Sequence, residues 1–476
     1  MSKRPATARP APRLRQLAKT VRHAELTRRF GTVKALRGLA IEAIGPNSRV
    51  GELCLILPAQ DGTSLPARLD PHAPGMQENG QILAEVVGIG EQQVTLMPYG
   101  GTRGLAVGGL VLALGDHSEI GVGDALLGRV IDHFGRPLDG LPAPRTTAAV
   151  PVRGRPVNPM RRPPIDTVLE TGIRSIDALL TLGRGQRVGI FAGSGVGKST
   201  LLGMIARHAE AEINVIALIG ERGREVREFV DKQLGPEGLK RSIVVVATAD
   251  QPALGRIRAA HAALAIAEHF RDQGKHVLLT MDSITRLAMA RREVALSAGE
   301  PPTARGYTPS VFAELPELCE RCGTAASGGT ITGLLTVLVE GDDLNEPISD
   351  ALRAILDGHI VLSRQIAHQG QYPAIDLLKS VSRLLSDLTT GDERLLVQET
   401  VRVLALLERN RQIVELGAYE SGSNPELDAA LSCRDRLLAW LRQAEGGVPR
   451  ATAMRELADW QAAFAKARLP AKEIAA

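Results

Sequence analysis

The stretch from Ala192 to Ser199 constrains the fold of this chain more than any other. Its sequence, AGSGVGKS, matches the phosphate-binding loop pattern, except that Ala192 replaces the first glycine. A glycine-rich backbone can curl until its N–H groups point inward at phosphate oxygens. The loop follows an apolar run, residues 187–192, and opens a helix-like segment, residues 198–209. This strand–loop–helix order predicts an α/β domain that binds a nucleoside triphosphate and argues against a chance glycine-rich turn.

Each residue of the loop has an expected role. Lys198 is expected to reach the β- and γ-phosphates of ATP, and Ser199 to offer its hydroxyl to Mg²⁺. The positive end of the dipole of the following helix also favours phosphate. The expected phosphate-binding residues are Gly193, Ser194, Gly195, Val196, Gly197, Lys198, Ser199 and Thr200.

Two acidic residues are expected to complete the site, because each follows an apolar strand. Asp282 ends the run 276–282, at the carboxyl end of a buried strand, where ligands bind in open α/β sheets. A carboxylate there can hold a Mg²⁺-bound water, although a helix N-cap aspartate fits the same spacing. Glu221 follows the run 214–220 and is placed to orient water in line with the γ-phosphate. A solvated ion-pair cluster is the competing interpretation of Glu221.

The spacing of apolar residues divides the rest of the chain into domains. Strand-like runs at 187–192, 214–220, 242–248, 276–282 and 330–340 alternate with helix-like segments such as 198–209, 224–232 and 257–271. This alternation predicts a parallel sheet covered on both faces. Short apolar runs separated by turn residues in 30–104 are typical of a small β-barrel or sandwich, and the pattern from 392 onward is helical. The expected domains are a basic segment 1–29, a β-barrel 30–104, a nucleotide-binding domain 105–391 and a helical domain 392–476.

Several motifs, in order along residues 30–430, resemble those of the bacterial protein-export ATPases that serve flagellar assembly and type III secretion. They are GIFAGSGVGKSTLLGMIAR, ALIGERGREVREF, HVLLTMDSITRLAMARRE, GEPPTARGYTPSVFAELPEL, TVLVEGDDLNEP and AILDGHIVLSR. That family is related to the catalytic subunit of rotary ATP synthases. The resemblance implies an α/β fold with a RecA-like core and a hexamer that hydrolyses Mg·ATP at its subunit interfaces.

The resemblance also implies roles for residues near the loop. Glu221 matches the catalytic glutamate of the GER motif, and Arg222 the arginine on the γ-phosphate side. Glu225 matches a glutamate that orders the metal waters, and Asp282 the Walker B aspartate. Ser199, Glu225 and Asp282 are therefore the expected metal-side residues.

Two further roles depend on the resemblance alone. Tyr372, in QYPAID, matches an aromatic residue that stacks on adenine, and Arg383, in SVSR, matches an arginine finger donated by the neighbouring subunit. Such an arginine brings positive charge to the γ-phosphate only when subunits meet, so it would link hydrolysis to assembly. From the residues alone, Tyr372 would be assigned to the core and Arg383 to the surface.

The family also implies partners: a regulator at the N-terminal segment, export-gate membrane proteins, a central stalk protein, export chaperones and their cargo.

The GYTPSVF and ATADQPAL stretches favour the flagellar branch over the virulence-secretion branch, which remains the alternative. The loop of a rotary ATP synthase catalytic subunit usually begins Gly-Gly and fits less well. A non-catalytic nucleotide-binding subunit would lack Lys198 or Glu221. A RecA-fold nucleic-acid motor is a third class, but 30–104 has only Phe30 and Tyr99 as stacking aromatics, so no nucleic-acid partner is expected.

The N-terminus is unusually basic. Residues 1–37 hold eleven Lys or Arg and one acid, Glu25, which leaves 46 basic and 52 acidic residues in the rest of the chain. Leu14, Leu17, Ala18 and Val21 fall at helical spacing between basic residues. This pattern predicts a short amphipathic helix that needs a partner surface or anionic lipid. A solvated tail is the competing interpretation.

Other signals bear on location and metal binding. No stretch reaches the roughly 18 uncharged apolar residues of a transmembrane helix, and the N-terminus lacks the apolar region of a signal peptide. The expected location is therefore the cytoplasm, and the family resemblance implies peripheral association with the inner-membrane export apparatus. Cys319 and Cys322 form a C-x-x-C pair without a second pair to complete a zinc site, and the sequence assigns them no role.

Overall fold

The computed structural model describes residues 28–57, 81–115, 118–154, 156–339, 341 and 343–468. The chain forms two compact units that divide after residue 117, and each is described by itself. The predicted N-terminal helix around Leu14–Val21 lies outside the described residues. Among those that are described, no helix has the length and apolar character that a membrane span requires.

The first unit is a closed six-stranded barrel with the strand order β1-β2-β5-β4-β3-β6. Its strands are β1 Phe30–Arg37, β2 Ala40–Ile44, β3 Leu53–Leu57, β4 Ile82–Ile89, β5 Gln93–Pro98 and β6 Leu110–Gly115. Alternate residues of β1 and β2, such as Val33 and Ile41, point into a small apolar core. The barrel closes only because β6 pairs with both β1 and β3. It therefore extends past residue 104, where the sequence pattern placed the end of this domain.

The second unit is built on a nine-stranded sheet with the order β19-β18-β12-β17-β15-β13-β14-β8, to which β16 is added beside β17. The strands are β8 Val130–Asp132, β12 Arg187–Ala192, β13 Ile213–Ile219, β14 Ser242–Ala247, β15 His276–Asp282, β16 Gly323–Thr324, β17 Thr330–Leu338, β18 Gly358–Leu362 and β19 Val381–Ser382. All pairs are parallel except those of β16 and β19. β8, β16, β18 and β19 extend the sheet beyond the five predicted strands; all four are too short for the apolar pattern to mark them.

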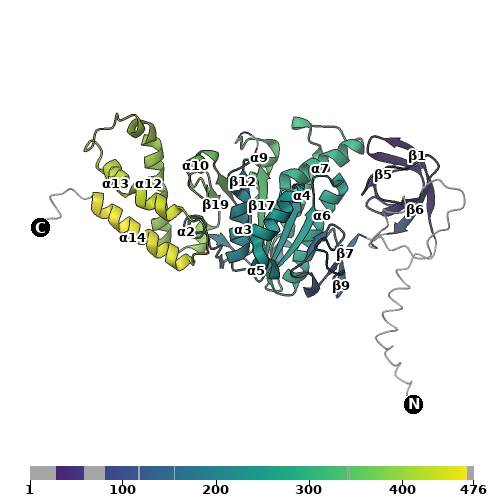
Figure 1. Ribbon diagram of the computed structural model, residues 1–476, viewed down its shortest axis with the longest axis horizontal. Coiled ribbons are helices and arrows are strands. Elements are labelled where there is room, and N and C mark those ends of the chain that lie inside the picture. Colours follow the sequence, from purple (N-terminus) through teal and green to yellow (C-terminus); the bar gives the residue numbers. More distant parts are fainter. Residues whose placement is uncertain are drawn as a thin grey trace, which may run out of the picture. The chain divides into compact units, whose positions relative to one another are not determined.

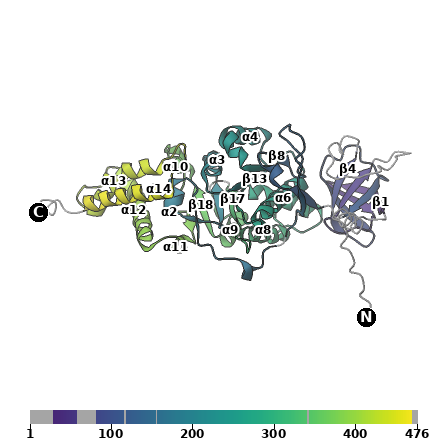
Figure 2. The same ribbon diagram turned by 90° about the horizontal axis from the view of Figure 1, so that it is seen from below.

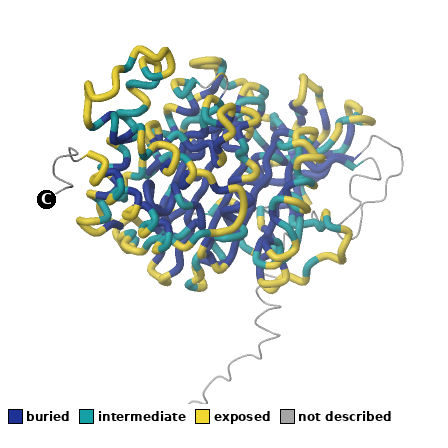
Figure 3. Tube along the Cα trace, turned by 60° about the vertical axis from the view of Figure 1, so that its left-hand side comes forward, coloured by how far each residue is buried: buried dark blue, intermediate teal, exposed yellow. Residues whose placement is uncertain are grey.

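Helices cover both faces of this sheet (Figure 1). The helices described between residues 174 and 388 are α2 Arg174–Leu179, α3 Lys198–His208, α4 Gly223–Glu228, α5 Gly235–Lys240, α6 Ala253–Asp272, α7 Ile284–Ser297, α8 Pro309–Arg321, α9 Pro347–Ile355, α10 Arg364–His368 and α11 Leu385–Leu388. Between α4 and α5, residues Phe229–Leu234 form a wider π-helical turn. β13 and β14 are buried at every position, as expected for strands covered on both sides. Figure 3 shows the buried positions running through the interior and the exposed positions at the surface.

The smaller strands and single helical turns join these elements. They are β7 Glu119–Val122, β9 Ala148–Pro151, β10 Val168–Leu169 and β11 Leu182–Gly183, with turns at Asp124–Leu126, Pro159–Arg161 and Ala304–Gly306. β7 pairs with β9, and β10 with β11, each as an antiparallel pair.

The last three helices that the structure describes are long: α12 Gly391–Glu415, α13 Pro425–Leu441 and α14 Arg450–Arg468. They pack side by side in both views (Figures 1 and 2). Trp460 of α14 is almost fully buried, stacks on Phe464 and donates a hydrogen bond of 3.1 Å from Nε1 to the Cys433 carbonyl of α13. The predicted fold class, an α/β core preceded by a β-barrel and followed by helices, is confirmed.

Candidate active site

The glycine-rich loop leaves β12 in the middle of the sheet, between β17 and β18. Gly195 and Gly197 have φ angles of 78° and 84°, in the left-handed region that glycine adopts without strain. Gly197 is the N-cap of α3, so the helix begins directly at Lys198. The first N–H groups of a helix have no partner within it. The N-terminus of α3 therefore presents backbone N–H donors, unpaired within the helix, beside the loop, as anion binding requires.

Lys198 lies close to two carboxylates at the carboxyl ends of the parallel strands. Its Nζ forms a close ion pair with Asp282 and lies 3.8 Å from Oε1 of Glu221. Asp282 is the last residue of β15, and Glu221 follows β13 after a single glycine. The exposed fractions of the Lys198, Glu221 and Asp282 side chains are only 12%, 18% and 5%. The structure thus brings together three residues that come from three separate parts of the sequence.

Asp282 is held in place by the neighbouring strand. Thr336, in the buried part of β17, donates from Oγ1 to Oδ1 of Asp282 over 2.7 Å. The contact fixes the carboxylate that faces Lys198. Because Lys198 and Thr336 converge on the same Oδ1 atom, Asp282 is oriented before any ligand arrives.

The environment of Glu221 favours its protonated form. Burial is the largest cause, the nearby negative charge of Asp282 is the second, and together they raise the pKa of Glu221 to about 7. Lys198 opposes this shift, and Glu225 adds to it. A carboxylate with a pKa near neutrality is suited to accept a proton from water at physiological pH.

The remaining predicted metal-side and phosphate-side residues lie around this cluster. Ser199 and Thr200 are exposed on the first turn of α3. Glu225 lies in the first turn of α4, and Arg222, the N-cap of that helix, approaches it to 3.6 Å. The side chain of Arg222 is 83% exposed.

Tyr372 lies against the phosphate loop. Two carbons of its ring, Cδ1 and Cε1, are 3.3 Å from the position that a Cβ atom on Gly197 would occupy. A side chain at residue 197 would therefore crowd the ring. Tyr372 is 45% exposed, which leaves part of the ring free to contact a ligand bound at the loop.

Arg383 is placed differently. It follows β19, the outermost strand on the β18 side of the sheet. Its backbone N–H donates to the Asp357 carbonyl over 2.9 Å, and its Nη2 donates to the Arg353 carbonyl over 3.0 Å. The guanidinium is exposed. The structure therefore does not bring Arg383 into the Lys198 cluster of its own chain.

Comparison with known proteins identifies the family. The model of the ATP synthase alpha/beta family nucleotide-binding domain matches residues 172–382, that of the beta-barrel domain of the same family matches 73–115, and that of the T3SS EscN ATPase C-terminal domain matches 389–459. The flagellum-specific ATP synthase of Bacillus subtilis (strain 168) is 53% identical over 416 residues, which cover 87% of this chain and 91% of that protein. The SPI-2 type 3 secretion system ATPase of Salmonella typhimurium is 46% identical over 420 residues, or 88% and 92% of the two chains.

The chain belongs to the flagellar and type III secretion ATPase family. Solved structures of the family agree with the fold. The assembled ATPase EscN from the type III secretion system of enteropathogenic E. coli matches with a TM-score of 0.82 and 42% identity, over 90% of this chain and 99% of that one. EscN in complex with its central stalk EscO matches with a TM-score of 0.80 and 41% identity, over the same shares. The predicted family and the predicted enzyme class, an ATPase, are confirmed.

Two residues of this ATPase that contact predicted site residues were missed by sequence reasoning. Thr336 is one of three threonines in β17, a pattern that fits an ordinary buried strand equally well. Gln443, in the connection between α13 and α14, donates its backbone N–H to the Tyr372 carbonyl over 2.9 Å. No local sequence signal marks it, because Tyr372 is distant in the sequence.

Proposed function

We propose that this chain hydrolyses Mg·ATP to support protein export through a flagellar type III export apparatus. The observation that carries this proposal is the cluster of Lys198, Glu221 and Asp282 beside the phosphate loop. The names of its flagellum-specific relatives support the flagellar branch.

The phosphate loop binds the triphosphate in this proposal. The loop residues Gly193 to Gly197 and the first turn of α3 supply backbone donors. Lys198 exchanges part of its contact with Asp282 for the β- and γ-phosphate oxygens, so that its charge stays compensated throughout. Tyr372, beside Gly197, stacks on the adenine base.

Glu221 acts on the attacking water. Its carboxylate accepts a hydrogen bond from that water and orients it in line with the γ-phosphate, and it accepts the proton as the new P–O bond forms and the bond to ADP breaks. Its pKa of about 7 keeps a large fraction of it available as a base at neutral pH.

The donor set beside Lys198 fits Mg²⁺. This ion prefers oxygen ligands and keeps several of its waters, and the Ser199 hydroxyl and the Asp282 and Glu225 carboxylates are oxygen donors at this edge of the sheet. The position of Asp282 is already fixed by Thr336. When bound, Mg²⁺ neutralises charge on the phosphate oxygens.

Arg383 supplies the last positive charge from a neighbouring subunit of a homo-hexamer. Its exposure at β19, away from Lys198 of its own chain, supports action in trans. The relative EscN was solved as an assembled ATPase and with its central stalk EscO, and we propose a corresponding assembly and a stalk partner here.

The further partners follow from the family. We propose that residues 1–29 bind a regulator, that the ATPase works in the cytoplasm beside export-gate membrane proteins, and that export chaperones with their cargo dock on it. A chain lacking residues 1–26 should hydrolyse ATP normally and lose the regulator in a pull-down. Unchanged capture would refute the role of this segment.

A deletion strain tests the biological function. Loss of the gene from its own bacterium should abolish flagellar filaments and motility, and the wild-type gene, but not Lys198→Ala, should restore them. Normal filaments combined with lost secretion of virulence effectors would assign the protein to the injectisome branch instead. Phosphate release by the purified chain should be insensitive to RNA, because strong stimulation by RNA would favour a nucleic-acid motor.

A further inference from the structure

We propose that Gln443 is a positioning residue that holds Tyr372 over the phosphate loop. Through Gln443, the connection between α13 and α14, residues 442–449, ties the C-terminal helices to the nucleotide site. The inference rests on the proposed function, in which Tyr372 stacks on adenine.

Gln443 is anchored by its side chain. The residue is 6% exposed, and its amide makes three hydrogen bonds to backbone groups. Oε1 accepts from the N–H of Arg174 over 2.9 Å, and Nε2 donates to the carbonyls of Gly172 and Gly446, each over 2.7 Å. Both N–H groups of the amide and its oxygen are therefore used. The side chain locks the 442–449 connection onto the segment that leads into α2.

The backbone of Gln443 carries the effect to the site. Its N–H donates to the carbonyl of Tyr372 over 2.9 Å, and the ring of Tyr372 lies against Gly197. Because the amide fixes where the backbone of residue 443 lies, it also fixes where the backbone of Tyr372 lies. The ring is then held at the mouth of the phosphate loop.

The same connection touches the far end of the phosphate-loop helix. A Cβ atom placed on Gly447 would fall 2.8 Å from Cγ of His208, the last residue of α3. The N–H of Val448 donates to the carbonyl of Gly172 over 3.0 Å. Residues 442–449 thus contact both α3 and Tyr372, so a shift of α13 and α14 is passed to the nucleotide site.

Direct binding measurements test the role of Gln443. Removal of the amide leaves the Arg174 N–H and the Gly446 carbonyl without their Gln443 partner and leaves the Gly172 carbonyl with the Val448 N–H alone, so the connection should relax and Tyr372 should lose its position. With the full chain and Mg²⁺, Gln443→Ala should raise the Kd for ATP by about tenfold, on the scale of one aromatic stacking contact. The Kd for inorganic tripolyphosphate, which has no base, should stay unchanged, and a general loss of packing would not produce this difference.

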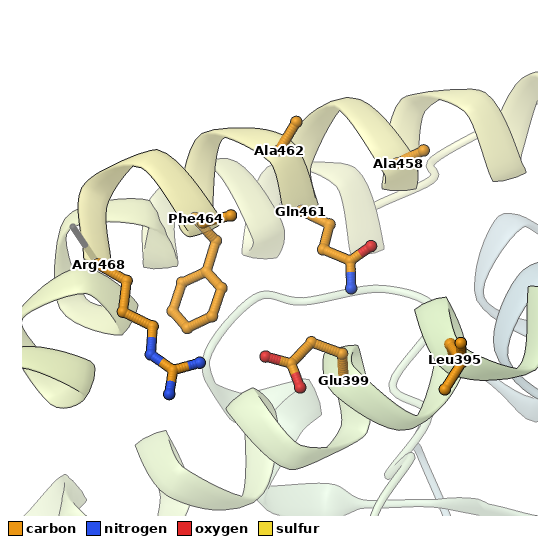
Figure 4. A pocket seen from close by; sticks show the side chains of 8 residues that line it. Leu395, Glu399, Ala458, Gln461, Ala462, Phe464 and Arg468 are labelled. Atoms are coloured by element: carbon orange, nitrogen blue, oxygen red, sulfur yellow. The ribbon is translucent and has the colours of Figure 1, made fainter. Parts of the chain in front are cut away.

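Gln461→Ala is the matched control. Gln461 belongs to the same helical domain and, with Phe464 and Arg468 of α14 and Leu395 and Glu399 of α12, lines a pocket between these helices (Figure 4). It should bind both ligands as the wild type does. If Gln443→Ala does not fold, Gln443→Asn, which shortens the side chain by one methylene, should give a smaller shift for ATP alone.

Tyr372→Ala distinguishes the positioning role of Gln443 from the adenine-stacking role of Tyr372, on which the inference rests. It should reproduce the ATP-specific loss, and the double variant with Gln443→Ala should be no weaker than Tyr372→Ala. Wild-type binding by Gln443→Ala, beside an ATP-specific loss in Tyr372→Ala, would overturn only the inference. No ATP-specific loss in Tyr372→Ala would overturn the base-stacking role itself. Equal weakening of both ligands in Gln443→Ala would mean a distorted phosphate loop and would also refute the inference.

Discussion

The ammonium group of Lys198 forms an ion pair with the carboxylate of Asp282 from the other side of β17. Lys198 follows β12 and Asp282 ends β15, so the pair joins two strands that do not touch directly. The negative charge of Asp282 already compensates the positive charge of Lys198. A phosphate ligand must therefore share Lys198 with Asp282. The pair therefore keeps Lys198 ordered at the loop, largely removed from water, before ATP binds.

Removing the lysine should abolish ATP binding and turnover together. Lys198→Ala deletes the charge at the β- and γ-phosphates and leaves Asp282 and Glu221 facing one another, which repels an anionic ligand. We expect no measurable binding of ATP by calorimetry at concentrations that saturate the wild type. Lys240→Ala, an exposed lysine on α5, is the control and should bind normally. Normal binding by Lys198→Ala would contradict the assignment of the loop.

The pKa of Glu221 predicts how activity depends on pH. Only the deprotonated carboxylate accepts a proton, and burial raises its pKa to about 7 in the free protein. kcat/KM should therefore fall as the pH drops below about 7, approaching tenfold per pH unit. The residual activity of Glu221→Gln should lack this slope. A wild-type profile that is flat down to pH 5, after correction for the titration of ATP, would show that Glu221 is not the base.

Loss of the Thr336 hydroxyl should weaken the response to Mg²⁺. Thr336→Val keeps the shape of the side chain but removes the hydrogen bond that orients Asp282. Loss of such a supporting contact should raise the Mg²⁺ concentration for half-maximal activity by about tenfold. Thr95→Val, on β5 of the barrel, should leave the Mg²⁺ titration unchanged. An unaltered titration in Thr336→Val would mean that Asp282 is held by other contacts.

Much of this fold can be predicted from the sequence, because its strongest signals are local. β13, β14 and β15 are mostly apolar runs, and the phosphate loop is one short motif. Since carboxyl ends of parallel strands meet at one edge, Glu221 and Asp282 were expected near Lys198. The short strands β8 and β18 lack such a signal. Their place depends on pairing with partners far along the chain.

The contacts that support the site could not be predicted from the sequence either, because they too join residues that are far apart along the chain. Thr336 and Gln443 are defined by what they touch, and a buried threonine or glutamine has no typical spacing. Gln443 bonds to Arg174, 269 residues away. The phosphate-side role of Arg222 stays a prediction from its motif, and in the single chain its side chain is 83% exposed.

Mixed oligomers should reveal action in trans. Arg383→Ala should assemble and bind ATP yet hydrolyse it poorly, because its neighbour loses the positive charge at the γ-phosphate. Mixing it with Lys198→Ala should restore part of the activity, since some interfaces then pair an intact loop with an intact Arg383. No recovery, with co-assembly shown by pull-down of differently tagged subunits, would mean that Arg383 does not act across the interface.

The central claim is that Glu221 drives hydrolysis in a site that Lys198 and Asp282 assemble for binding. Glu221→Gln tests it most directly, because the substitution keeps the shape of the side chain and removes its negative charge and its ability to accept a proton. ATP affinity and single-turnover hydrolysis should be measured on the same protein. The account predicts ATP binding within about threefold of the wild type and hydrolysis slower by roughly a hundredfold or more. Near-normal hydrolysis by Glu221→Gln would contradict it.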